Sequence, residues 1–320
     1  MVWRLATAVA LLFAAGCAVH DPELAARVDR GRLATQVELR DVPFFPQEQY
    51  QCGPAALATV LTYSGRPVTA DSLAPRMYLP ERRGSLQIEL IATARSQGRI
   101  PYLLAPKTDA LLAELNAGRP VVVLQNLGLE GVPLWHYAVV VGYSAADNTF
   151  LLRSGTERRR VERASAFGTR WALGQQWALI VLRPGELPAS RDESRYLKSV
   201  ADVEAVRGAA GLAPAYSAAL TAWPDSRVAR FGLARALDAD GEPTAAEREY
   251  RKLLARNPDD VTSLNNLADL LRRSGCRSEA QAMIGRALAM TASDDPLRPT
   301  LEQTQREVTA MPASDAACPR

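Results

Sequence analysis

Residues 47–61 read Gln-Glu-Gln-Tyr-Gln-Cys-Gly-Pro-Ala-Ala-Leu-Ala-Thr-Val-Leu, a polar loop that turns into an apolar segment at Cys52. Gly53 gives the turn backbone freedom, and Pro54 suits a first helical turn, where its missing N–H would have no partner anyway. The segment that follows is apolar on nearly every side, so we expect a buried helix that ends near Gly65. A cysteine at the start of such a helix lies over unpaired backbone N–H groups and the positive end of the helix dipole. Both features favour the thiolate.

A cysteine nucleophile needs a group that accepts and returns its proton, and that group is usually histidine. The chain has two histidines, and His20 lies in a segment typical of a leader, which leaves His136. Cys52 and His136 together predict a cysteine peptidase. Each also has a plainer interpretation, as an inert buried cysteine and a core histidine. Trp135, beside the histidine, either lines a substrate cleft or belongs to the core.

Composition excludes several other classes of protein. A length of 320 residues allows about two domains, and an apolar content of 48% allows a sizeable core. The net charge is +3, and the basic groups Arg82-Arg83 and Arg158-Arg159-Arg160 have no aromatic residues between them, so we expect no nucleic-acid partner. The four cysteines lack the close spacing of a zinc site, so we expect neither a metal nor another cofactor.

The N-terminus has the features of an export signal: Arg4, then an apolar run that is too short to span a bilayer, then small residues before Cys17. Ala-Gly-Cys17 resembles a bacterial lipoprotein signal, which implies that residues 1–17 form the signal and that Cys17 is lipidated. A plain, cleaved signal peptide is the alternative. Ala18 after the cysteine resembles lipoproteins of the outer membrane, so we expect a periplasm-facing protein of the cell envelope. Residues 18–36 suit a tether.

Residues 37–186 have the pattern of an α+β domain. Its first half is rich in helices and its second half in antiparallel strands. The apolar spacing and the turn residues predict the elements. The expected helices, besides the one at Cys52, span residues 69–74, 86–97, 108–117 and 162–172. Pro75 is expected to end the first of these, and Thr69 to cap it. The expected strands span residues 37–45, 100–104, 120–125, 135–143, 150–153 and 177–182.

Residues 195–291 follow a linker at 187–194 and contain an internal repeat. A shift of 34 residues aligns Leu233 with Leu267 and Gly241 with Gly275, and the pattern resembles the all-α tetratricopeptide repeat. Such repeats present a surface that normally binds a peptide or protein, although so short an array could also be a stabilising appendage. The polar tail, residues 292–320, is expected to be loosely ordered.

Cysteine usage predicts one disulfide. Cys276 falls in the turn of the last repeat and Cys318 near the C-terminus, and two such cysteines in an exported protein are natural partners. Cys52 would then remain free, as a nucleophile must.

The segments QYQCGPAALATVL and WHYAVVVGY together resemble the papain-like peptidases that process bacteriocin leaders, the double-glycine family. The resemblance covers residues 37–186 and implies that Cys52 is the nucleophile and His136 the general acid and base. It also implies an oxyanion-hole glutamine before the cysteine, for which Gln47 is the nearest candidate. The family's third residue is acidic, whereas residues 152–155 contain no carboxylate, and Ser154 is a weaker possible acceptor of the imidazole proton.

Two functions from different classes follow. The first is an envelope-located thiol peptidase that cleaves an exported or partner polypeptide held by the repeats. The second is a non-catalytic binding module on a peptidase fold. Acyl transfer rather than hydrolysis is a third possibility. Bacteriocin-processing peptidases are accompanied by a transporter with the ATP-binding motif GxxxxGK[ST], and this motif does not occur in the sequence. The resemblance therefore implies little about the substrate.

Overall fold

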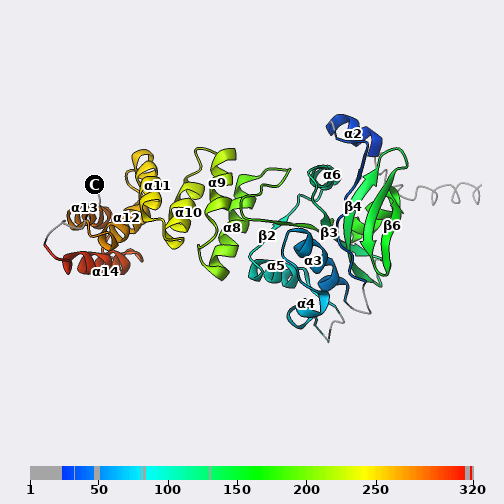
Figure 1. Cartoon of the computed structure of the whole chain (residues 1–320), viewed down its shortest axis with the longest axis horizontal. Coiled ribbons are helices and arrows are strands. Elements are labelled where there is room, and N and C mark those ends of the chain that lie inside the picture. The colour runs from blue at the N-terminus through cyan, green and yellow to red at the C-terminus, as the bar shows by residue number, and fades with distance from the viewer. Residues whose placement is uncertain are drawn as a thin grey trace, which may run out of the picture. The chain divides into compact units, whose positions relative to one another are not determined.

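The computed structural model describes residues 24–31, 33–46, 51–79, 81, 84–129, 131–313 and 318. The chain forms two compact units. Unit 1 comprises the residues up to Thr93 together with Leu103–Val181, and unit 2 comprises Ala94–Tyr102 together with Leu182 onward. Figure 1 labels many of the elements of both units. In the described part of the chain, no helix is long and apolar enough to span a membrane.

Unit 1 is built on an antiparallel sheet whose strands follow the order β7-β3-β4-β5-β6, with β1 paired to β4. Figure 1 labels β3, β4 and β6 of this sheet. Every residue of β3 is buried, as are the last eight residues of β4. The prediction of an α+β domain is therefore confirmed. The strands are β1 (Gln36–Glu38), β3 (Val121–Asn126), β4 (Trp135–Ser144), β5 (Thr149–Ser154), β6 (Glu157–Arg163) and β7 (Ala178–Leu182).

Helix α3 (Cys52–Tyr63) is the central helix of unit 1 and packs against β4 and β3. Its residues Gly53–Leu61 are all buried, as expected for a segment that is apolar on every side. The chain leaves the helix through Gly65, whose φ of 79° lies in the left-handed region that favours glycine. The predicted helix and its end are thus confirmed.

The other helices of unit 1 differ from expectation in two places. Pro75 lies inside α4 and does not end it, because Leu73 and Met77 are buried one turn apart and hold the last turn in place. Thr69 caps this helix as predicted. The expected tether contains α2, whose Leu24 and Val28 are buried. These helices are α2 (Leu24–Gly31), α4 (Ala70–Met77), α5 (Gln87–Ser96, of which residues 94–96 belong to unit 2), α6 (Thr108–Asn116) and α7 (Ala164–Leu173).

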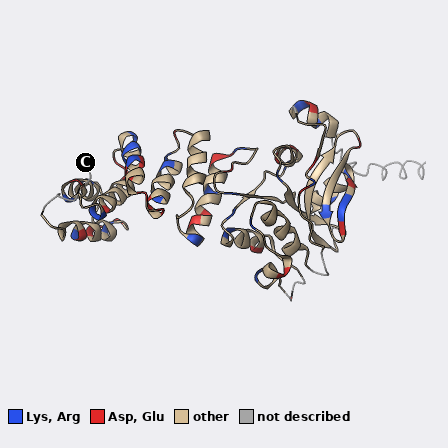
Figure 2. Cartoon of the chain, in the orientation of Figure 1, with Lys and Arg blue, Asp and Glu red and all other residues tan. Residues whose placement is uncertain are grey.

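Strand β6 is absent from the sequence prediction, which placed the start of a helix at Glu162. The strand has the sequence Glu-Arg-Arg-Arg-Val-Glu-Arg and forms one edge of the sheet, with five of its seven residues exposed. Figure 2 shows the charged residues along it. Charged side chains are common on edge strands, where they prevent pairing with other chains, so polarity alone could not separate this strand from a loop. Helix α7 begins after it, at Ala164.

Unit 2 contains residues 100–102 of strand β2 (Ile100–Leu103) and a series of helices. Arg95 and Asp202 form an ion pair of 2.6 Å, which ties the end of α5 to α8 within this unit. Gly241 and Gly275 have φ angles of 80° and 79° in equivalent turns, as the repeat predicts. The helices are α8 (Glu193–Arg207), α9 (Ala213–Ala222), α10 (Arg227–Ala239), α11 (Pro243–Arg256), α12 (Val261–Arg273), α13 (Arg277–Ala289) and α14 (Arg298–Thr309).

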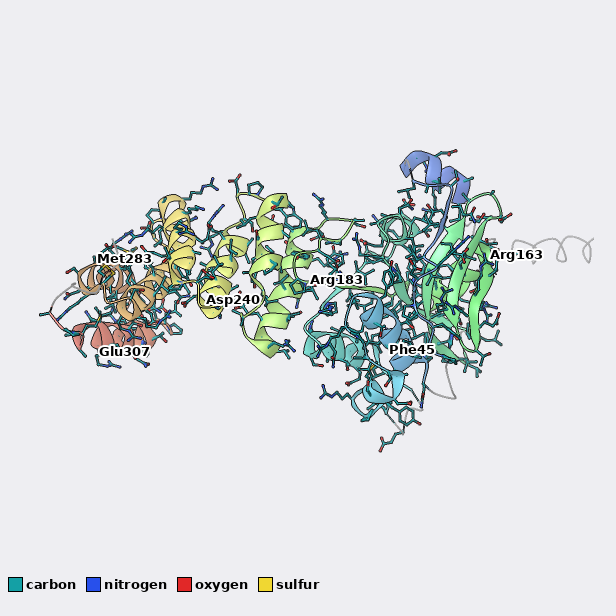
Figure 3. The ribbon with its side chains drawn as sticks, in the orientation of Figure 1. Phe45, Arg163, Arg183, Asp240, Met283 and Glu307 are labelled. Atoms are coloured by element: carbon teal, nitrogen blue, oxygen red, sulfur yellow. A yellow bond between two sulfur atoms is a disulfide. The ribbon has the colours of Figure 1, made fainter. Side chains whose placement is uncertain are left out.

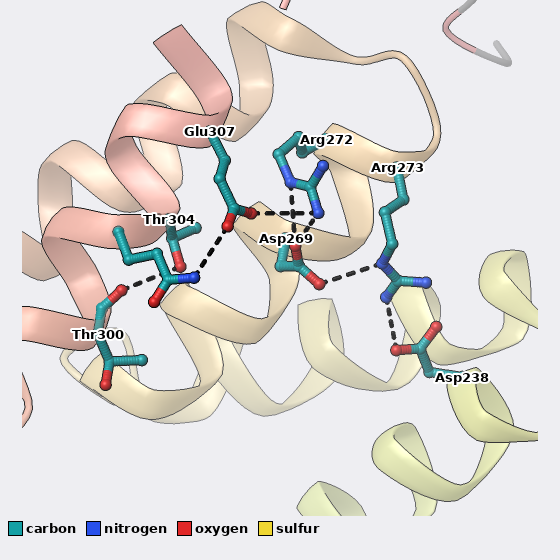
Figure 4. A network of polar contacts seen from close by, with 8 residues as sticks. Asp238, Asp269, Arg272, Arg273, Thr300, Thr304 and Glu307 are labelled. Atoms are coloured by element: carbon teal, nitrogen blue, oxygen red, sulfur yellow. Dashed lines mark hydrogen bonds and ion pairs between the residues drawn. The ribbon is translucent and has the colours of Figure 1, made fainter. Parts of the chain in front are cut away.

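The expectation of a loosely ordered tail is wrong for residues 298–309, which form α14. Leu301 and Val308 lie on one face of this helix and are buried in the apolar core of the last repeat, against which Met283 also packs (Figure 3). Glu307 of α14 pairs with Arg272 of α12 in the polar network that Figure 4 shows. The segment is so polar that its two buried apolar residues, which lie two helical turns apart, do not stand out as a helical pattern in the sequence.

The structure joins Cys276 and Cys318 by a disulfide across a sequence separation of 42 residues. Cys276 is buried in the same core, and Cys318 packs against it. The bond therefore holds the end of the chain on the last repeat.

We expect Cys318→Ser to lower the free energy of unfolding of unit 2 by about 3–4 kcal/mol, because the unfolded chain loses the cross-link that restricts it. Urea denaturation with and without reductant measures the effect, and Cys52→Ser is the matched control, since Cys52 is a free cysteine in unit 1. An unfolding curve of the wild type that does not respond to reductant would contradict this account.

Candidate active site

Cys52 is the first residue of α3 and is a free, partly buried cysteine. The side chain of Gln51, at the N-cap position, makes no capping hydrogen bond. The backbone groups of Cys52 and Gly53 instead make hydrogen bonds that stabilise the ionised sulfur. A third such bond comes from the backbone of Tyr137 on β4. The sulfur is therefore held between the start of the helix and the strand that follows His136.

Burial raises the pKa of the Cys52 thiol above its ordinary value, and the three backbone hydrogen bonds lower it by less. The expected thiolate is therefore not the resting form: at neutral pH the sulfur is a protonated thiol. The helix start favours the charge, but the loss of water around a partly buried sulfur outweighs it.

Ser85 lies against the first turn of α3. A Cβ added at Gly53 would come within 2.7 Å of both Cβ and Oγ of Ser85, so only glycine allows this approach. The Ser85 carbonyl oxygen accepts a hydrogen bond of 3.3 Å from the Tyr137 hydroxyl, while the Ser85 Oγ is buried with no hydrogen-bond partner. Sequence reasoning missed this residue, because a serine shortly before a helix resembles an ordinary helix cap.

His136 is the second residue of β4, and its Nε2 lies 2.8 Å from Oγ of Ser154 at the end of β5. Ser154 is buried and is the residue that the sequence suggested as a possible acceptor for the imidazole. Because Nε2 is engaged with Ser154, Nδ1 is the ring nitrogen that remains for a second partner.

The pKa of His136 is lowered from 6.5 to about 4, first by burial and second by the nearby charge of Arg160 on β6. The imidazole is therefore neutral at physiological pH and can act as a base. Arg160 itself pairs with Glu157 at 3.5 Å on the same strand.

The structure brings Cys52 next to Tyr137, the residue after His136, but does not hydrogen-bond the thiol to the imidazole within the described part of the chain. Gln47 and Cys17 fall outside the described residues. Trp135 is 51% exposed, so it is not a core residue. Among described residues, no group of histidine, cysteine and acidic side chains could hold a metal ion. The arrangement offers a nucleophile and a base, both uncharged at rest.

We expect the stability of the protein to fall as pH drops from 6.5 towards 4, because the unfolded state binds a proton at His136 that the folded state excludes. His136→Gln should remove roughly 2–3 kcal/mol of this loss. This value is smaller than the free energy that corresponds to the full pKa shift, because the side chain is partly exposed to solvent. Urea denaturation of both proteins at several pH values measures the difference in their free energies of unfolding. The carboxylates contribute equally to both proteins, so their effect drops out of this difference. Parallel pH profiles would exclude the buried, neutral imidazole.

Gly53→Ala should destabilise the protein by about 1–3 kcal/mol, because the new methyl group would overlap Ser85. Ser85→Gly removes both clashing atoms, so the double variant should recover most of the loss. Thermal unfolding of the two single variants and the double variant forms the test. Equal stability of Gly53→Ala and the wild type would show that the helix start does not meet Ser85 this closely.

Comparison with known proteins finds two families that are similar to parts of the chain. Residues 39–177 match the Peptidase_C39 like family, and residues 208–264 match the tetratricopeptide repeat. The chain is also 30% identical over 153 residues to the "Cellulose synthase operon protein C" of Xanthomonas axonopodis pv. citri (strain 306). That alignment covers 45% of this chain and 10% of the relative, so the chain spans about a tenth of that protein's length.

Two solved structures are also similar. One is a putative C39-like peptidase from Bacillus anthracis, at 17% identity and a TM-score of 0.40, with 46% of this chain and 98% of that chain covered. The other is the peptidase domain of Streptococcus ComA, a bi-functional ABC transporter involved in a quorum-sensing pathway, at 16% identity and a TM-score of 0.37, with 44% and 98% covered. The two family matches therefore describe parts of the chain: a stretch similar to the Peptidase_C39 like family precedes a stretch similar to the tetratricopeptide repeat.

Proposed function

We propose that the protein is a thiol peptidase that cleaves a polypeptide through an acyl-enzyme on Cys52. The observation that carries the proposal is the position of the sulfur: it lies at the start of a buried helix, against the backbone of the residue that follows His136. The imidazole in turn is bound by Ser154. A nucleophile, a base beside it and a group that orients the base are the three parts of such a site.

In the proposed reaction, the Cys52 sulfur attacks the peptide carbonyl carbon while its proton passes to Nδ1 of His136. The Cys52 N–H and the side-chain amide of Gln47 donate hydrogen bonds to the negative oxygen of the tetrahedral intermediate. His136 then protonates the leaving amine as the C–N bond breaks. In the second half, His136 takes a proton from water, the resulting hydroxide attacks the thioester, and the C–S bond breaks with return of the proton to sulfur.

Ser154 would orient the imidazole by accepting a hydrogen bond from its Nε2–H group. A neutral hydroxyl stabilises the imidazolium less than a carboxylate does, because it carries no opposing charge. The low pKa of His136 is consistent with this lack of a negative neighbour. We therefore propose a slow peptidase.

We also propose that lipidation at Cys17 holds the protein at the outer membrane, facing the periplasm, and that the repeats bind the substrate or a partner protein. The Cys276–Cys318 disulfide supports an oxidising compartment. The exported-type N-terminal sequence points the same way. Bacterial fractionation of the full chain and of a Cys17→Ser variant tests the anchor.

A non-catalytic binding module is the second candidate, and the charge states of the site favour it. The pKa of Cys52 is raised and that of His136 is lowered, so the pair does not form the thiolate–imidazolium couple of an already activated site. In this function the peptidase fold would grip a polypeptide without cutting it.

Hydrolysis of a mixed peptide pool, followed by mass spectrometry, separates the two functions. We expect slow cleavage by the wild type, none by Cys52→Ala or His136→Gln, and at least about tenfold faster cleavage by Ser154→Asp, because a carboxylate would stabilise the imidazolium. Ser154→Ala should be slower than the wild type. No cleavage by wild type or Ser154→Asp, with the pool still bound, would establish the binding module.

A further inference from the structure

The loop between β3 and β4, residues 127–134, presents large apolar side chains to solvent. Leu129 is 75% exposed, Val132 74% and Leu134 61%, and the adjoining Trp135 is 51% exposed. We refer to these four residues as the apolar loop. Single exposed apolar residues are ordinary on a protein surface, whereas four within seven positions usually mark a surface that binds something.

The apolar loop is held in one shape by Asn126, the buried last residue of β3. Its Oδ1 accepts hydrogen bonds from the backbone N–H groups of Gly128, at 2.9 Å, and Leu134, at 2.8 Å. Its Nδ2 donates to the Leu129 carbonyl at 3.3 Å. One side chain thus fixes both ends of the loop.

Backbone contacts add to this rigidity. Leu129 and Val132 form a pair of backbone hydrogen bonds, each of 3.2 Å, across the tip of the loop. A Cβ at Gly128 would lie 2.4 Å from the Val132 carbonyl oxygen, so this position has room for glycine alone. The apolar side chains are therefore held in water by a rigid frame, and binding would require little ordering of the loop.

The apolar loop leads directly into the candidate active site, because Trp135 is followed by His136 on β4. We infer that the loop binds an apolar side chain of the polypeptide substrate, next to the peptide bond that Cys52 attacks. The inference rests on the proposed function and adds to it the substrate class: polypeptides with a large aliphatic residue near the cleaved bond.

Charge favours a peptide over a lipid surface. Residues 127–134 contain no lysine or arginine, and Glu130 is their one charged residue. Segments that bind membranes usually combine apolar with basic residues, which attract anionic lipids. An apolar, uncharged to acidic loop beside a peptidase-type site fits an aliphatic side chain better.

Equilibrium binding to Cys52→Ala protein tests the inference without catalysis. The probes are pairs of peptides that are identical except at one position, which carries leucine in one peptide and serine in the other. The position is moved along the peptide from one pair to the next. We expect the leucine peptide to bind about tenfold more tightly at one position, the range typical of an apolar contact. Adding Leu129→Ser and Val132→Ser should abolish that preference. Val161→Ser is the matched control, because Val161 is a 53% exposed valine on β6 of the same unit.

Equal binding of the two peptides at every position, or a preference that survives the double substitution, would overturn the inference. So would phosphatidylglycerol vesicle binding or self-association that the double substitution removes, since either would assign the loop to another occupant. Hydrolysis of the same peptides by the wild-type protein separates the peptidase proposal from the apolar-loop proposal. Cleavage without a preference for leucine would support the peptidase and reject the role of the apolar loop. Binding that prefers leucine, without cleavage, would support the role of the loop and reject the peptidase.

Discussion

The packing of α3 against β4 is the contact on which the candidate site depends. The helix has no polar face, so it can be stable only when it is enclosed by the sheet and its neighbouring helices. Enclosing it brings its N-terminus, with Cys52, against the backbone of Tyr137. The position of the sulfur is thus a consequence of the core, and Gly53 is the point at which that core is tightest, against Ser85.

The same burial sets the charges of the site. A helix start offers N–H groups that stabilise a thiolate. For this partly buried sulfur, the loss of hydration destabilises the thiolate more than the backbone hydrogen bonds stabilise it. His136 is affected in the same direction, towards its neutral form. Under the proposed function, the site would stay uncharged until a substrate arrives, and proton transfer would accompany attack on the carbonyl. In this account the resting enzyme is protected from oxidation and alkylation, and Ser154 sets how well the charged imidazole is tolerated.

The sequence was sufficient where a pattern has one structural solution. An all-apolar segment after Cys-Gly-Pro predicted α3, and a repeat with glycines at equivalent turns predicted the helices of unit 2. The sequence also offers Ser154 as a partner for His136, because it stands where a carboxylate is expected, and the two side chains are in contact. The sequence was insufficient where tertiary contacts decide. Strand β6 and helix α14 are too polar to be recognised without the surfaces they cover, and the pKa of Cys52 depends on a depth of burial that no local pattern reports.

The central claim is that the Cys52 sulfur and the His136 imidazole act as one unit, and trapping the cysteine with a peptidyl vinyl sulfone tests it most directly. The sulfur must add to this electrophile while a proton is supplied, so intact-mass measurement and peptide mapping report both groups together. The account predicts one adduct, on Cys52, that forms much more slowly in His136→Gln. An adduct that forms equally fast without the imidazole, or no adduct on Cys52 at all, would contradict it.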